Sequence, residues 1–141
     1  MEKISGVRIT AQDFTKISFE KQVSLPHSAG VYVSMHGAGT THIFHSALGA
    51  SNCCALVELQ PEERLGYKDT VGHGNLARRH GMHYYRYNAP TGYTAHTGTS
   101  VDVEDVVALV TRAVEAVSTS PTCLGDVRDT RDPRLFKFQW L

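Results

Sequence analysis

Short apolar runs alternate with amphipathic segments along the chain, and their periods predict strands and helices in turn. Residues 29–35 and 54–59 are continuous apolar stretches bounded by glycine or proline, as buried strands are. Residues 83–87 alternate aromatic and polar side chains and are expected to form a third strand. In residues 102–117 valine and alanine recur every three or four positions, which predicts a helix with one buried face.

Weaker signals fill the intervals between these elements. Residues 5–10 favour a strand, and residues 18–23 favour a helix that Pro26 closes early. A helix over 40–48 ending at Gly49, a short helix over 75–80 stopped by Gly81, and a loop over 88–100 complete the pattern. Strands that alternate with helices are typical of a parallel sheet, because parallel neighbours need a crossover connection. We therefore expect an α/β fold, a Rossmann-like parallel sheet with flanking helices.

The length of 141 residues predicts a single domain. We assign residues 1–120 to a Rossmann-like lobe and residues 121–141 to a tail that packs back or is partly disordered. Fourteen basic residues balance fourteen acidic ones, so no net charge draws the chain to nucleic acid or to an anionic membrane. No stretch has the roughly 18 consecutive apolar residues of a membrane span, and the first ten residues lack the apolar core of a secretory signal.

The best candidate for a ligand-binding segment lies between a predicted buried strand and a predicted helix. It is Met35-His36-Gly37-Ala38-Gly39-Thr40-Thr41-His42. In open α/β sheets ligands bind at the carboxyl ends of the strands, and a glycine-rich turn lets backbone N–H groups approach a phosphate. The segment is neither the dinucleotide fingerprint nor a P-loop. It predicts a diphosphate cradle; the alternative is that Gly37 and Gly39 only permit a tight turn.

Several motifs, taken in order, carry a resemblance to a known family. They are Phe19-Glu20-x-Gln22-Val23, residues 29–34, His36-Gly37-Ala38-Gly39, Leu56-Val57-Glu58-Leu59-x-Pro61, Tyr67, Leu76-Ala77 and residues 81–85. Over residues 6–117 the chain resembles the carboxyl-terminal lobe of family 61 glycosyltransferases. This family includes protein O-linked N-acetylglucosamine transferases of the secretory pathway and plant xylosyl- and arabinosyltransferases.

The resemblance implies one lobe of a GT-B enzyme, which transfers a sugar with inversion from a UDP-sugar to a hydroxyl of a protein or glycan acceptor. It implies no cofactor and no obligatory metal. His36 becomes the catalytic candidate, stabilising the departing UDP. The resemblance also implies that the donor diphosphate lies against Gly37, Ala38, Gly39 and Thr40, and that Glu58 binds the ribose hydroxyls. Arg64, on the loop after Glu58, either contacts the diphosphate or is a solvated charge.

The chain departs from the family pattern in places. Thr40 replaces a large apolar residue, and no part of the 141 residues resembles the amino-terminal lobe, which would supply acceptor contacts and the general base. We expect either a truncated enzyme or, alternatively, a non-catalytic nucleotide- or partner-binding module, with a homodimer in place of the missing lobe as one option. Family membership would imply the endoplasmic reticulum or Golgi lumen, although we expect neither a signal nor an anchor within the 141 residues.

Other kinds of site are weaker candidates. Zinc could be held by His42 with His45 or by His80 with His83, although paired cysteine spacing is missing and the three cysteines fit buried thiols better. Ser34 or Cys53 could be a nucleophile, but no Gly-x-Ser-x-Gly elbow is present. The remaining aromatic candidates, Tyr84, Tyr85 and Tyr87, fit core packing better than a stacking platform for bases.

Overall fold

The structure is a computed structural model of the whole chain, and it describes residues 6–46, 55–60, 72–89 and 100–119. In chain order its elements are the 3-10 helix η1 (Phe14–Lys16), α1 (Phe19–His27), β1 (Val31–Met35), the 3-10 helix η2 (Ala38–His42), α2 (Ile43–Ser46), β2 (Ala55–Gln60), α3 (Gly72–Arg79), β3 (His83–Asn88) and α4 (Val103–Thr119). The three strands pair in parallel in the order β1-β2-β3. The predicted class, a Rossmann-like α/β fold, is confirmed.

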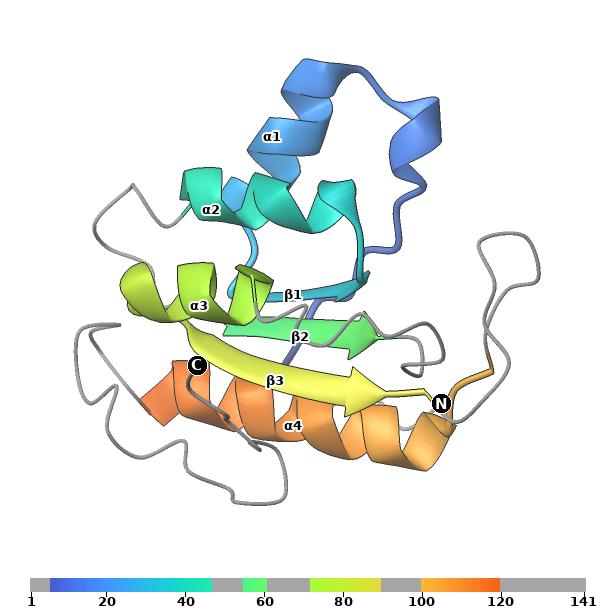
Figure 1. Cartoon of the computed structure of the whole chain (residues 1–141), viewed down its shortest axis with the longest axis vertical. Helices are drawn as coiled ribbons and strands as arrows, with labels where there is room; N and C mark the ends of the chain where they lie inside the picture. Colours follow the sequence, from blue (N-terminus) through green and yellow to red (C-terminus); the bar gives the residue numbers. More distant parts are fainter. Residues whose placement is uncertain (1–5, 47–54, 61–71, 90–99, 120–141) are drawn as a thin grey trace.

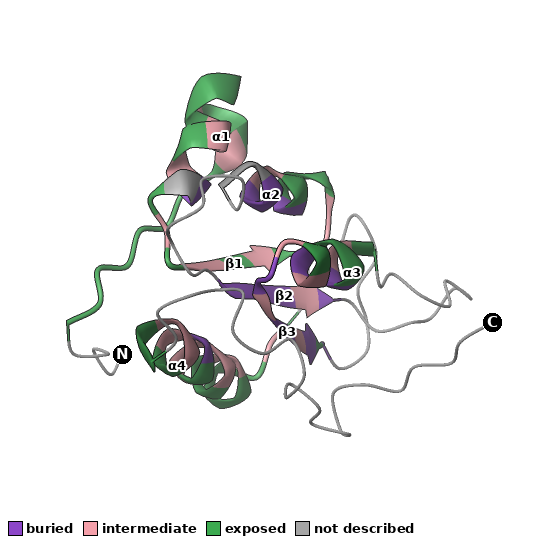
Figure 2. Cartoon of the chain, turned by 90° about the vertical axis from the view of Figure 1, so that its left-hand side faces the viewer, coloured by how far each residue is buried: buried purple, intermediate pink, exposed green. Residues whose placement is uncertain are grey.

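Helices cover both faces of the sheet. α2 and α3 lie on one face, with α1 beyond α2, and α4 runs along the other face (Figure 1). The central strand β2 is the most deeply buried part of the chain (Figure 2), and Ala55, Leu56 and Val57 are completely inaccessible to solvent. A central parallel strand is covered on both faces, which explains why its sequence is an almost unbroken apolar run.

Alternation along the strands divides the core into two halves. On the face covered by α2 and α3 the core consists of Ile43, Phe44, Leu56, Ala77, Met82 and Tyr84. On the face covered by α4 it consists of Ala55, Val57, Tyr85 and Ala113, with Leu109, Val110 and Val117 packed against them. The three tyrosines of β3 are all buried, so the prediction that they serve as core is confirmed.

Two tyrosine hydroxyls attach α4 to the sheet, and a carboxylate caps its first turn. The Tyr87 hydroxyl accepts the backbone N–H of Asp102 at 2.7 Å, and the Tyr85 hydroxyl donates to the Arg112 carbonyl at 3.4 Å. The Asp102 carboxylate caps the helix by accepting the N–H groups of Glu104 and Asp105. The predicted amphipathic helix therefore begins where its cap residue indicated, and it ends at Thr119, slightly beyond the expected position.

Some local predictions are wrong. Residues 6–10 form no strand; they are exposed, and a strand is stable only beside a neighbour that takes its hydrogen bonds. α1 continues through Pro26 to His27, because a proline in the last turn removes only one intrahelical hydrogen bond.

The two short helices also begin earlier than predicted. The helix after the glycine turn starts as η2 at Ala38, and α3 starts at Gly72. Gly81 ends the α3 turn with φ +69°, as expected of a glycine helix stop. Gly49 and the tail at 121–141 lie outside the described residues, and no helix of the described segments is long and apolar enough to cross a bilayer.

Candidate functional site

The candidate site lies where β1 and β2 end. The sheet continues one residue past β1, because the His36 N–H donates to the Leu59 carbonyl at 2.8 Å. Alternation along the strands directs Ser34, His36 and Glu58 to the face that α2 and α3 cover. The predicted glycine turn therefore starts at the carboxyl edge of the sheet, beside the end of β2.

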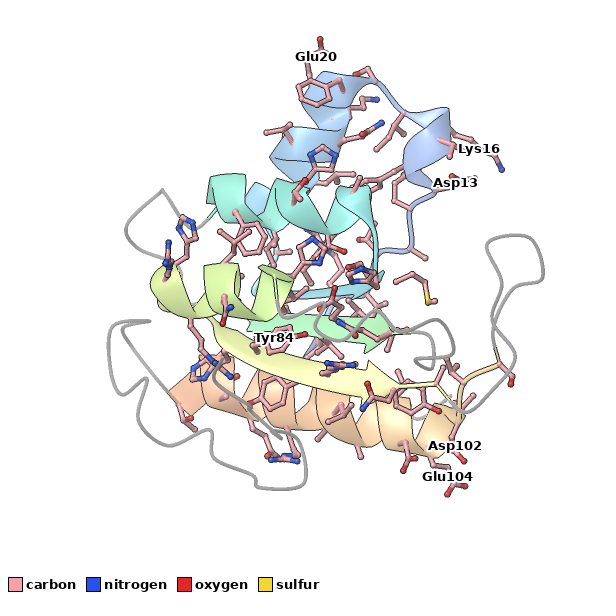
Figure 3. All side chains as sticks on the ribbon, viewed as in Figure 1. Asp13, Lys16, Glu20, Tyr84, Asp102 and Glu104 are labelled. Carbon is pink, nitrogen blue, oxygen red and sulfur yellow. The ribbon has the colours of Figure 1, made fainter. Side chains whose placement is uncertain are left out.

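Glu58 is the centre of this site, and its side chain is completely buried. Its Oε1 lies 2.7 Å from Nδ1 of His36 and 2.6 Å from Nδ1 of His73. Its Oε2 accepts the Tyr84 hydroxyl at 2.6 Å and the Gln60 amide at 3.2 Å. Figure 3 shows Tyr84 among the side chains between α3 and the sheet. We call Glu58, His36 and His73 the Glu–His cluster.

The charge state of Glu58 decides which protons the histidines carry. Burial raises the pKa of Glu58, but hydrogen bonds from Tyr84, His73, His36 and Gln60 outweigh burial and hold that pKa below its ordinary value of 4.5. The group is therefore a carboxylate at neutral pH and can only accept hydrogen bonds. Both histidines must then carry a proton on Nδ1, which leaves Nε2 of each ring as the nitrogen available to a ligand.

Solvent exposure increases from the carboxylate to the imidazoles. The side chain of Glu58 is completely buried, whereas the side chain of His73 is 14% exposed and that of His36 is 28% exposed. The two ring centroids lie 5.1 Å apart, and the Phe44 ring lies 6.2 Å from the His73 ring. Any molecule that reaches the cluster from solvent therefore meets imidazole before it meets carboxylate.

The glycine turn is open. A Cβ added at Gly37 would meet nothing within 4 Å, and one added at Gly39 would meet only Phe14 Cδ2, at an ordinary 3.9 Å. Packing therefore does not demand a glycine at either position, which weakens the alternative of a purely steric role. Ala38 and Gly39 are exposed, and the first N–H groups of a helix have no acceptor inside it.

Thr40 has a different place from its neighbours. It is completely buried, and its hydroxyl donates to the Met35 carbonyl at 3.1 Å and lies 3.0 Å from the Ser34 hydroxyl. The side chain thus fastens η2 to the end of β1, which a large apolar residue could not do by hydrogen bonding. The Ser34 hydroxyl shares a hydrogen bond with the Thr40 hydroxyl, so the structure gives no support to Ser34 as a nucleophile. Arg64 and Cys53 lie outside the described residues.

Within the described segments, the Glu–His cluster is the one group with the residue types of a metal site. Its N–O separations of 2.6 and 2.7 Å are hydrogen-bond lengths. Zinc bonds of about 2.0–2.1 Å would spread tetrahedral ligands to roughly 3.3 Å. Two of the histidines considered for zinc lie elsewhere: the His42 ring contacts Phe14 and Phe19, and the His80 ring stacks on Phe44.

Sequence reasoning missed His73, which belongs to the start of α3, two residues before the predicted helix over 75–80. One signal was available. Glu58 interrupts an otherwise apolar buried strand, and a buried carboxylate requires donors from other elements. That requirement predicts polar partners near β2 without identifying which of the eight histidines supply them.

Fold and site together define an α/β chain with a Rossmann-like sheet and a histidine–carboxylate site at its carboxyl edge. Among curated proteins it is similar to the "EGF domain-specific O-linked N-acetylglucosamine transferase" of Mus musculus, of Rattus norvegicus and of Pan troglodytes, each 28% identical over 130 residues. The match covers 82% of this chain and 23% of each relative, so the chain spans about a quarter of their length. No protein-family model and no solved structure matches it significantly. The similarity supports a distant relationship to glycosyltransferases.

Proposed function

We propose that this chain is the donor-binding lobe of an inverting glycosyltransferase that uses a UDP-sugar. One observation carries the proposal: His36, held through Nδ1 by the buried carboxylate of Glu58, lies directly before an open glycine turn at the carboxyl edge of a parallel sheet. Ligands of such sheets bind at this edge. The distant similarity to glycosyltransferases supports the same assignment.

In the proposed reaction an acceptor hydroxyl attacks the anomeric carbon from the side opposite the UDP group. The new C–O bond forms as the bond to the β-phosphate oxygen breaks, and the hydroxyl proton passes to a base outside this lobe. Negative charge grows on the departing UDP. The imidazolium of His36 and the first N–H groups of η2 stabilise that charge, an effect that is strongest where water is excluded.

Glu58 acts in this proposal through the histidines and not as a contact to ribose. Its two oxygens already accept hydrogen bonds from four side chains, and no part of it reaches solvent. An ionised carboxylate accepts the Nδ1 proton of the imidazole beside it, which leaves Nε2 for the ligand. In this proposal the imidazole and the backbone N–H groups, and no metal ion, stabilise the departing UDP.

Calorimetry with UDP, uridine and UDP-sugars tests the assignment. The chain should bind UDP more tightly than uridine, and an excess of EDTA should leave the UDP affinity unchanged. His36→Asn keeps a donor near the Nδ1 position but lacks Nε2, so it should weaken UDP binding by roughly 10- to 100-fold, as expected for a hydrogen bond to a charged group. The uridine affinity of this variant should match that of the wild-type chain.

His42→Asn is the matched control, because the His42 ring packs against Phe14 and Phe19 and the hydrogen bonds to Glu58 come from other side chains. It should bind UDP like the wild-type chain. Absence of any binding heat with UDP or with UDP-sugars at millimolar concentration would reject the donor-lobe assignment.

A further inference from the structure

His73 has no role in the donor site described so far, although it shares the carboxylate of Glu58 with His36. Its Nδ1 lies 2.6 Å from Glu58 Oε1, closer than the 2.7 Å of His36. The two imidazoles reach the same oxygen from different directions, one from the turn after β1 and one from the first turn of α3. Both rings are partly exposed, and both retain a free Nε2 because Nδ1 is committed to the carboxylate.

The charge of the cluster shows what the second imidazole adds. With both histidines neutral, the Glu–His cluster carries one negative charge, which repels an anion. With one imidazolium the cluster is neutral, and with two it carries one positive charge. His36 and Glu58 alone can reach no more than neutrality. Only the second imidazole, His73, gives the cluster a net attraction for a diphosphate.

We propose that His73 is a second diphosphate-binding imidazole of the donor site, and that Glu58 is the positioning residue that fixes both rings with Nε2 free. The inference rests on the proposed donor-lobe function. UDP binding then takes up protons, because the bound diphosphate favours the doubly protonated cluster.

Among the described residues, the other charged and titratable groups close to the cluster keep their charge state. Burial and the Glu58 carboxylate raise the pKa of Tyr84, so its phenol stays neutral. Arg78 and Arg86 are the charged groups that act on Tyr84, and guanidinium groups remain cationic throughout the physiological range. On the α2 side, the Phe44 ring lies 6.2 Å from the His73 ring and stacks with the His80 ring at 5.6 Å.

Calorimetry with UDP in two buffers of different ionisation enthalpy, at about pH 8 where UDP itself is fully ionised, measures the proton uptake. The variant is His73→Asn, whose amide can still donate to Glu58 from near the Nδ1 position but offers nothing at Nε2. In His73→Asn we expect the UDP affinity to fall roughly 10- to 100-fold. The number of protons taken up on UDP binding should fall by up to about one. His80→Asn, on the same side of the sheet, is the control and should change neither quantity.

His73→Gln is the second variant, because its amide reaches the Nε2 position but cannot be protonated. It should recover part of the UDP affinity that His73→Asn loses and none of the proton uptake, a pattern that a purely structural role would not produce. Wild-type affinity and proton uptake in His73→Asn would overturn the role of His73 and leave the donor-lobe assignment standing. A wild-type chain that does not bind UDP would overturn both.

Discussion

Replacing Glu58 by glutamine tests whether the buried carboxylate holds the site together. The substitution keeps the size of the side chain but removes its charge, and it replaces one accepting oxygen by an NH2 group that can only donate. Two of the four hydrogen bonds can then persist as neutral ones, and the other two donors lose their acceptor. A hydrogen bond to a charged group contributes about 1.5–3 kcal/mol and a neutral one about 0.5–1.5 kcal/mol, so each kept bond is weakened by about 1 kcal/mol and each lost bond costs its full contribution. Relief from burying a charge offsets part of the sum, so we expect Glu58→Gln to lower the free energy of unfolding by about 2–4 kcal/mol near neutral pH.

The stabilisation that Glu58 provides depends on pH, and the sign of this dependence follows from the pKa of Glu58. The pKa of Glu58 is held below its ordinary value of 4.5 in the folded chain. The stabilisation is therefore fully present above the unfolded pKa and is lost as pH falls through the folded pKa. Urea unfolding followed by circular dichroism should show a gap between the wild-type chain and Glu58→Gln that is constant near neutral pH and closes below about pH 4.

Glu104→Gln provides the control for this experiment. Glu104 is exposed at the start of α4, on the other face of the sheet from Tyr84 (Figure 3). The free energy of unfolding of the Glu104→Gln variant should stay within about 0.5 kcal/mol of the wild-type value. An equally stable Glu58→Gln variant, or a gap that does not change with pH, would refute the view that the carboxylate is ionised and fully hydrogen-bonded.

Two further changes test the turn and its neighbours. Gly37→Ala adds a Cβ into open space, so it should weaken UDP binding and leave the urea unfolding midpoint unchanged. Gly74→Ala brings its Cβ to 2.8 Å from the Tyr84 ring, so it should lower the free energy of unfolding by about 1–3 kcal/mol. Gly37→Ala with unchanged UDP affinity would argue against the cradle. Thr40→Val removes the donor to the Met35 carbonyl and should destabilise the chain by about 1–2 kcal/mol in the same assay; a neutral effect would mean that the turn is held by other contacts.

The fold was largely readable from local patterns. Residues 54–59 are apolar because the central parallel strand is covered on both faces, and the spacing of valines in α4 follows from its packing on one face. Residues 29–35 were also predicted to be a buried strand, but β1 lies at the edge of the sheet, where Val33 and Met35 are exposed. Local patterns failed where pairing or packing decides the outcome. Residues 6–10 have strand-like composition but no neighbouring strand, and α3 begins earlier than its helix-forming residues because Gly74 packs against Tyr84.

For the candidate site, the sequence by itself determined the glycine turn, its position after a strand, and the presence of a glutamate inside an apolar run. Only the tertiary structure decided that His36, His73 and Tyr84 meet on that glutamate. The physical reason is that hydrogen bonds to a buried carboxylate come from whichever elements the sheet and α3 bring within about 3 Å. Spacing along the chain carries no information about such contacts, since His73 is 15 residues and Tyr84 is 26 residues away from Glu58.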